Sequence, residues 1–478
     1  MLFNTFDFAI FLPIVFLLYW FVVGKSLKAQ NLLLLVASYY FYACWDWRFL
    51  FLLIFSTFLD YYTGIKMEQA KQFHFKRFWF WLSISVNLGF LGVFKYYDFF
   101  AQSFAESVAQ LGFQVSPSTL GLILPVGISF YTFHGLSYVI DIYKQRIHAE
   151  RNFVDYAVFV SFFPLLVAGP IERATHLLPQ IKSRRVFNYE QAIDGLRQIL
   201  WGLFKKIVVA DSCAHFANEI FNQSGDYSGS TLLVGAIFFT FQIYGDFSGY
   251  SDIALGTARL FGVELLRNFA YPYFSRDIAE FWRRWHISLS TWFRDYLYIP
   301  LGGSKGGTWM RVRNTFIIFL VSGFWHGANW TFIVWGGLNA LYFLPLLLTN
   351  KNRDNLEIVA QGKIFPSLKE TFQMVSTFAL TVLAWIFFRA ESVGHAWSYL
   401  SGIFSRSLFS VPEVRPTNIF VILGLFMLIE WAGRQHKFAI EGIGYRLNRP
   451  VRYAFYYVLI VSIFYFSGKE QNFIYFQF

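Results

Sequence analysis

The feature that most constrains this chain is a series of apolar runs, each close to the length that crosses a lipid bilayer. A spanning helix needs about 20 mostly apolar residues. Such runs predict an all-α integral membrane protein with about eleven spanning helices and one or two re-entrant or tilted pieces. The runs lie near residues 8–23, 31–45, 49–64, 78–96, 119–139, 154–169, 199–212, 231–256, 314–333, 334–349, 370–389, 417–433 and 453–468.

Composition supports a membrane location. Of 478 residues, 56% are hydrophobic and 14% are charged, whereas soluble domains carry roughly a quarter charged residues. In water such a chain would expose large apolar patches, which a bilayer covers. We therefore expect one polytopic membrane domain over residues 1–478, without a second soluble domain.

The net charge of +11 would suggest nucleic acid in a soluble protein. Here the basic residues lie in short segments between apolar runs, where the positive-inside rule places cytoplasmic loops. The placement of basic loops on the cytoplasmic side therefore accounts for the net positive charge, and we expect no nucleic-acid binding. The rule predicts an outer N-terminus and an outer stretch from Asp98 to Thr119, which has no Lys or Arg.

The motifs of several common sites are absent from the sequence. The residues Met1 to Asp7 lack a basic segment and no cleavage site follows, so the first run reads as a retained helix. Cys44 and Cys213 are the only cysteines, too few for a disulfide framework or a structural zinc site. No HExxH, CxxC or GxGxxG motif occurs. We expect no metal and no bound cofactor.

Two segments depart from simple spanning helices. The run 154–169 has basic residues on both sides and ends at Gly169-Pro170, which predicts a re-entrant segment buried in protein. The stretch 266–313 is rich in arginine and aromatic residues, which predicts helices that lie along the cytoplasmic side or dip into the bundle. Within it we expect Arg294 and Asp295 to form an ion pair, and residues 302–307 to form a flexible turn.

His326 is the strongest candidate for chemistry. It follows Asn314, where its apolar run begins, by about 18 Å of helix, near the middle of a hydrocarbon core of about 30 Å. An ionisable group at that depth predicts function, and Gly323 and Gly327 let another backbone or a substrate come close. The alternative is a structural histidine that donates to a carbonyl of a neighbouring helix.

His286 lies among Trp and Arg residues in the segment from Phe281 to Ser288. It could orient a substrate carbonyl or act as a second base, and it could equally be a packed structural residue. Both interpretations stay open. His134 is expected to be a packing residue.

A third polar segment runs from Tyr244 to Asp252 in otherwise apolar sequence. Its carboxylates and hydroxyls need partners in lipid. Asp246 could fix the tautomer of a histidine, or pair with Arg283 or Arg294. A structural polar network between helices is the alternative for each residue taken alone.

Five motifs in this order resemble the membrane-bound O-acyltransferase (MBOAT) family. The resemblance is greatest to the branch of bacterial alginate O-acetylation proteins, with D-alanyl transfer proteins more distant, and the MBOAT core is expected at roughly 119–350. The motifs are Leu124–Phe133, Gly169–Arg173, Asp246–Asp252, Phe281–Ser288 continuing to Tyr298–Gly303, and Trp325–Gly327.

The resemblance implies a ring of helices around a central tunnel, with His326 as the catalytic histidine and His286 at the second site position. Neutral His326 would accept the proton of an attacking hydroxyl, since burial lowers a histidine pKa. Residues expected to bind or orient substrate are Asp246, Ser248, Tyr250, Arg283, Arg284, Trp285, Trp325 and Asp295.

The resemblance also implies partners. The donor would be acetyl-CoA or another acyl thioester on the cytoplasmic side, attracted by the basic 266–313 region. An extracytoplasmic acyltransferase of the SGNH type would receive the acyl group, which this resemblance implies is acetyl, and modify a polysaccharide or peptidoglycan. The location would be the bacterial inner membrane.

Two other classes of function stay open. A transporter or flippase would pass a polar substrate without chemistry, although the inverted repeats that favour one are absent. A non-catalytic scaffold of an exopolysaccharide machine is the other.

Overall fold

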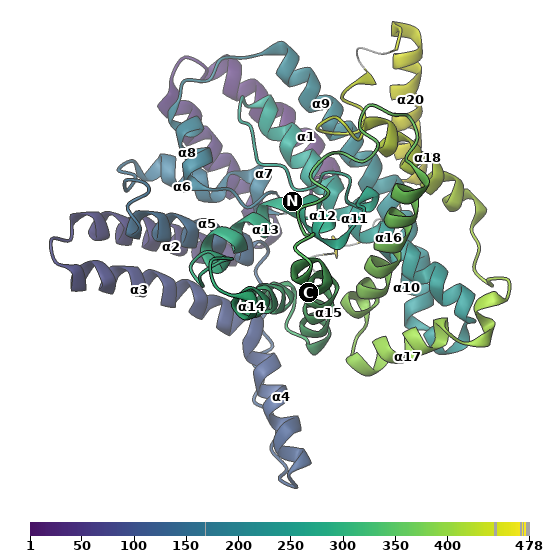
Figure 1. Cartoon of the computed structure of the whole chain (residues 1–478). Helices are drawn as coiled ribbons and strands as arrows, with labels where there is room; N and C mark the ends of the chain where they lie inside the picture. The colour runs from purple at the N-terminus through teal and green to yellow at the C-terminus, as the bar shows by residue number, and fades with distance from the viewer. Residues whose placement is uncertain (168, 444–446, 469–470, 472, 475–478) are drawn as a thin grey trace. The chain divides into compact units, whose positions relative to one another are not determined.

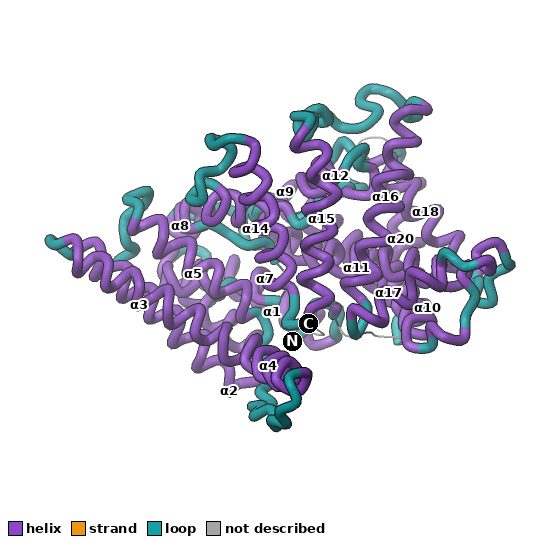
Figure 2. The backbone as a smooth tube through the Cα atoms, turned by 60° about the horizontal axis from the view of Figure 1, so that its bottom comes forward, coloured by secondary structure: helices purple, strands orange, loops and turns teal. Residues whose placement is uncertain are grey.

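The computed structural model describes residues 1–478 except 168, 444–446, 469, 470, 472 and 475–478. The described residues form helices and loops without a strand (Figure 2), which confirms the all-α class. Five helical segments are long and apolar enough to cross a membrane: Leu27–Gln69, Phe73–Gln110, Gly229–Leu260, Trp330–Leu348 and Leu368–Arg389. Shorter apolar helices cover Phe6–Val22 and Thr417–Gly433. The expected number of spans and the ring around a tunnel stay predictions.

The chain divides into two compact units. Unit 1 contains Met1–Ala192 and Thr257–Leu266, and unit 2 contains Ile193–Gly256 and Arg267–Phe478. The expected single domain over 1–478 stays a prediction.

Unit 1 is built around α2, which packs against α3, α5 and α6 (Figure 1). A kink at Asp46 (φ −157°, ψ 110°) divides α2, and the Asp46 carboxylate accepts from the Arg48 backbone N–H at 3.0 Å. The kink falls between the expected runs 31–45 and 49–64, so the sequence located this break correctly. The helices are α1 (Phe6–Leu17), α2 (Leu27–Gln69), α3 (Phe73–Leu91), α4 (Tyr97–Gln110), α5 (Ile128–Tyr143), α6 (Phe153–Ser161), α7 (Phe163–Leu166) and α8 (Ala174–Lys182).

The run 154–169 forms α6 and α7, which a break at Phe162 separates. The nine residues of α6 reach only about 14 Å, so neither helix crosses a bilayer, in keeping with a re-entrant segment. The next motif along the chain, Gly169–Arg173, has a structural role in unit 1. His134 Nε2 accepts from the Glu172 backbone N–H at 3.0 Å, and the Glu172 carboxylate accepts from the Leu266 N–H at 2.6 Å. His134 is therefore a buried packing residue, as predicted.

Unit 2 carries the other three motifs. A π-helical segment, Phe204–Ala210, joins α9 to α10. The stretch 266–313 holds short helices, as predicted, and glycines 302 and 303 form a turn with positive φ angles. The helices are α9 (Tyr189–Leu203), α10 (Asp211–Asn222), α11 (Gly229–Leu260), α12 (Ile278–Arg284), α13 (Ile287–Phe293), α14 (Thr308–His326), α15 (Trp330–Leu348), α16 (Leu368–Arg389), α17 (Val393–Ile403), α18 (Thr417–Gly433) and α20 (Arg449–Phe466).

Helix α14 ends at His326, so the predicted continuous run 314–333 is wrong. Gly327 is extended (φ −161°, ψ 151°), and Asn329 caps the next helix by accepting from the Thr331 N–H at 3.0 Å. A Cβ atom on Gly327 would lie 2.1 Å from the Phe332 ring. The tight reversal therefore places His326 at the end of α14.

Candidate active site

His326 lies in an aromatic enclosure and is 3% exposed. Its ring centroid is 4.9 Å from that of Trp325, 5.2 Å from Trp335 of α15 and 5.4 Å from Phe388 of α16. Aromatic walls exclude water and leave an imidazole in an environment of low dielectric. A base at this position acts on a substrate without competition from bulk water.

His286 belongs to the same site. Its ring centroid is 6.3 Å from that of His326, and its backbone between α12 and α13 is left-handed (φ 42°, ψ 56°). Such strain in a residue other than glycine is often found at functional sites. Among the described residues neither ring nitrogen of His286 has a hydrogen-bond partner, and burial lowers its pKa. The sequence left its role open, and the structure places a neutral imidazole beside His326.

The two tryptophans predicted for the site differ in position. Trp325 contacts both histidines, with its ring 6.0 Å from that of His286. Trp285 is fully buried and packs on Trp385, Phe281 and Phe269 at centroid distances of 5.0, 5.5 and 5.0 Å. Trp285 thus supports the wall of the site from behind.

The two arginines predicted for the site, Arg283 and Arg284, donate hydrogen bonds to backbone carbonyls. Arg283 donates to the carbonyls of Asn352 and Asn355 at 2.8 and 2.7 Å, which fixes the loop after α15, and burial lowers its pKa. Arg284 pairs with Glu280 at 2.8 Å and donates to the Ala270 carbonyl at 3.1 Å. Both arginines thus brace loop backbone.

Asp246 has different partners from those predicted. Its Oδ1 lies 2.9 Å from Lys206 Nζ, and its Oδ2 accepts from the Ile474 backbone N–H at 2.7 Å. Of the possibilities left open by the sequence, these partners are those of a structural polar network, with a lysine in place of Arg283 or Arg294. The neighbouring Asp252 pairs with a lysine as well, Lys205, at 2.5 Å.

Three further residues predicted for the site, Tyr250, Ser248 and Asp295, have different surroundings. Tyr250 is fully buried, 4.4 Å from the Phe473 ring. Ser248 lines a small cavity of about 20 Å³ beside Asp252. Asp295 pairs with Arg294 at 2.8 Å, as predicted.

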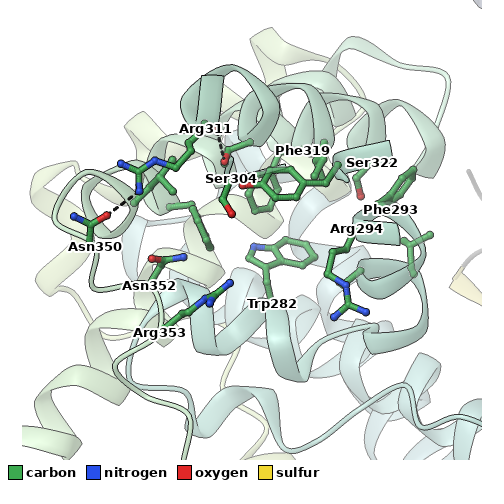
Figure 3. A pocket seen from close by; sticks show the side chains of 17 residues that line it. Trp282, Phe293, Arg294, Ser304, Arg311, Phe319, Ser322, Asn350, Asn352 and Arg353 are labelled. Atoms are coloured by element: carbon green, nitrogen blue, oxygen red, sulfur yellow. Dashed lines mark hydrogen bonds between the residues drawn. The ribbon is translucent and has the colours of Figure 1, made fainter. Parts of the chain in front are cut away.

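A cavity of about 540 Å³ lies in unit 2, within the size range of small-molecule pockets. Neither His286 nor His326 is among the described residues that line it. Ser322, which lines it, lies one turn before His326 on α14. Figure 3 shows Trp282 between Arg353 and Arg294, with Phe319 above Trp282 and Arg311 at the upper left, hydrogen-bonded to Asn350. No acidic residue appears among the described residues that line the cavity. An anionic molecule with an apolar part suits such a lining.

Several of these residues were missed by the sequence analysis. The lysines 205 and 206 stood in the apolar run 199–212, and their charge was the available signal. Glu430 accepts from Trp201 Nε1 at 3.2 Å and from the Tyr244 hydroxyl at 2.5 Å. A carboxylate within the apolar run 417–433 was a similar signal. The aromatic residues that surround His326 gave no such signal, because aromatic residues make up 22% of the whole chain.

Comparisons with known proteins identify the class. The model of the membrane-bound O-acyltransferase family matches residues 145–363. The chain is 39% identical over 417 residues to the probable alginate O-acetylase AlgI of Pseudomonas aeruginosa, covering 87% of this chain and 77% of that protein. It is 38% identical over 433 residues to a peptidoglycan O-acetyltransferase of Helicobacter pylori, covering 84% and 80%. It is 31% identical over 260 residues to a teichoic acid D-alanyltransferase of Streptococcus thermophilus, covering 50% and 61%.

The chain therefore belongs to the membrane-bound O-acyltransferase family. It is a multi-pass membrane enzyme that transfers acyl groups. This membership favours catalysis over the transporter and scaffold alternatives.

Proposed function

We propose that this chain takes an acyl group, most simply acetyl, from a thioester bound on the cytoplasmic side and delivers it for O-acylation of an exported or cell-surface polysaccharide. The cavity of about 540 Å³, which Ser322 lines one turn before His326 on α14, is the observation that carries this proposal. The acceptor class follows from relatives named as an alginate O-acetylase and a peptidoglycan O-acetyltransferase.

The lining of the cavity suits a thioester donor such as acetyl-CoA. Arg294, Arg311 and Arg353 supply positive charge for phosphate groups, which guanidinium groups bind with particular geometric fit. Trp282 and Phe319 supply apolar surface for the thioester arm. The lining includes Ser322, about 6 Å along the axis of α14 from His326. In this scheme the thioester carbonyl binds at the Ser322 end of the cavity, one helical turn from His326.

At the reacting end, His326 acts as the general base. The acceptor hydroxyl oxygen attacks the thioester carbonyl while the imidazole takes its proton. A new C–O bond forms, the C–S bond breaks, and the proton passes from His326 to the departing thiolate. His286, neutral at physiological pH because burial lowers its pKa, orients the carbonyl or the hydroxyl by a hydrogen bond.

Transfer to a polymer outside the cell needs a carrier. We assign this step to an extracytoplasmic acyltransferase partner of the SGNH type, with the chain in the bacterial inner membrane. Asp246, Ser248, Tyr250 and Trp285 support the site structurally in this scheme, and Trp325 orients substrate directly.

Binding of a non-hydrolysable acetyl-CoA analogue to the purified full-length protein tests the donor pocket. Arg311→Ala should weaken binding about tenfold, because it removes one charged hydrogen bond of about 1.5 kcal/mol. Arg313→Ala is the matched control, since Arg313 stands two residues along α14 and does not line the cavity. Equal affinity in all three proteins would exclude this cavity as the donor site. Glycan ester content in a complemented deletion strain then tests transfer itself.

A further inference from the structure

Lys206 occupies an unusual position for a lysine. It lies in the π-helical segment Phe204–Ala210 and is 1% exposed. Its Nζ lies 2.6 Å from Asp211 Oδ1 and 2.9 Å from Asp246 Oδ1. Burying charged groups is costly unless they are fully paired, so a chain retains such a cluster where it has a task.

The cluster also binds backbone from a distant part of the sequence. Lys206 Nζ donates to the Gln471 carbonyl at 3.1 Å, and Asp246 accepts from the Ile474 N–H at 2.7 Å. One ammonium and one carboxylate thus bind the backbone of Gln471 and of Ile474. If the cluster only joined α11 to the π-helical segment, it would need neither of these two backbone hydrogen bonds.

The segment that these contacts hold carries a buried aromatic residue towards the histidine site. Phe473 is fully buried, with its ring 4.4 Å from that of Tyr250 and 6.3 Å from that of Phe247. Phe247 in turn presents its ring edge-on to His286, at a centroid distance of 4.6 Å and an angle of 86°. The segment therefore supports the wall on which His286 rests.

We propose that the buried cluster of Lys206, Asp211 and Asp246 is a dock for the segment that carries Gln471, Phe473 and Ile474. We propose further that this docked segment positions His286 through Phe473 and Phe247. The docking is independent of the reaction, whereas its effect on transfer rests on the proposed function. Lys206 and Asp246 are positioning residues in this scheme, because they act through the segment.

Removal of one backbone N–H tests the dock directly. Ile474→Pro keeps an apolar side chain of similar size but lacks the donor to Asp246. Ile474→Val, which keeps the N–H, is the matched control. In the Cys44→Ser background, Gln471→Cys introduces a thiol while the carbonyl that accepts from Lys206 remains. The only other cysteine, Cys213, is fully buried.

Maleimide labelling of the purified protein in detergent reports whether the segment is docked. We expect Ile474→Pro to raise the labelling rate at position 471 at least tenfold, and Ile474→Val to leave it unchanged. Lys206→Met should raise it as well. Equal labelling of all these proteins would overturn the dock.

Ester content of the glycan in the complemented deletion strain reports positioning. Ile474→Pro should lower it at least tenfold at matched protein level, with Ile474→Val as the reference. If labelling rises and ester content stays normal, the segment docks but does not position the site. If the parent protein itself forms no ester, the proposed function fails, while the labelling still decides the dock.

Discussion

Packing of α14 against α15 fixes where His326 lies, and Gly336 is one of the glycines, with Gly323, that make that packing possible. A Cβ atom on Gly336 would lie 2.3 Å from the Phe319 carbonyl oxygen and 3.3 Å from Leu320 Cα. Ordinary Cβ contacts are longer than 3.4 Å. Gly336→Ala must therefore push the helices apart by about 1 Å. Gly337→Ala is a matched control, because its nearest neighbour would be Leu320 Cδ2 at 3.8 Å.

The expected difference between the two variants follows from two opposing effects. An alanine in a helix interior is about 0.5–1 kcal/mol more stable than glycine, and both variants gain it. Gly336→Ala also suffers overpacking against backbone, which costs about 1–3 kcal/mol. The free energy of unfolding should thus be lower for Gly336→Ala than for Gly337→Ala by about 1–3 kcal/mol.

Reversible unfolding in mixed micelles with increasing SDS, followed by tryptophan fluorescence, measures this difference. Glycan ester content at matched protein level measures the displacement of His326, and we expect it to fall in Gly336→Ala alone. Equal stability and equal ester content for the two variants would refute the argument from close packing.

The other predictions concern single side chains. His326→Ala should abolish glycan esters in a complemented deletion strain while insertion is unchanged, and His286→Ala should lower them; full activity of His326→Ala would remove it from the mechanism. Asp295→Asn breaks an exposed ion pair and should change the free energy of unfolding by less than about 1 kcal/mol. The hydrogen bond from His176 to Glu172 raises the pKa of His176 above its usual value, against the opposing effect of burial. Its stabilising effect is present below the unfolded pKa of about 6.5 and is lost as pH rises through the higher folded pKa. Relative to His176→Gln, the parent protein should lose stability between about pH 6 and pH 8, measured by SDS unfolding; parallel pH profiles would contradict the assignment.

The sequence predicted features that depend on short stretches of chain. The kink at Asp46, the short helices of 266–313 and the pair of Arg294 with Asp295 all follow from local composition and neighbouring residues. The histidine pair was also predicted, although its geometry was not. That prediction rested on the order of the motifs, because His286 and His326 lie in different segments of the chain, before α13 and at the end of α14.

What the sequence did not predict depends on three-dimensional neighbours. Asp246 pairs with Lys206 and with the backbone of Ile474, which is 228 residues away. Pairing of buried charges follows spatial proximity, and no spacing rule in the sequence gives it. The end of α14 at His326 was missed for another reason. An apolar run continues through it, and one glycine and one capping asparagine outweigh that pattern.

The lysine pairs bear on the chemistry of the histidines. A carboxylate close to an imidazole favours the charged form and raises its pKa, which would weaken a base meant to work while neutral. Both carboxylates of the Asp246–Asp252 motif are engaged by lysines, at 2.9 Å for Asp246 and 2.5 Å for Asp252. His286 instead faces the edge of Phe247. In the proposed mechanism each lysine offsets the charge of its carboxylate, so that these carboxylates do not raise the pKa of the imidazoles. A thiolate leaving group needs less protonation than an alkoxide, since a thiol has a pKa of about 8.5. A neutral base in an aromatic enclosure is therefore sufficient for transfer from a thioester.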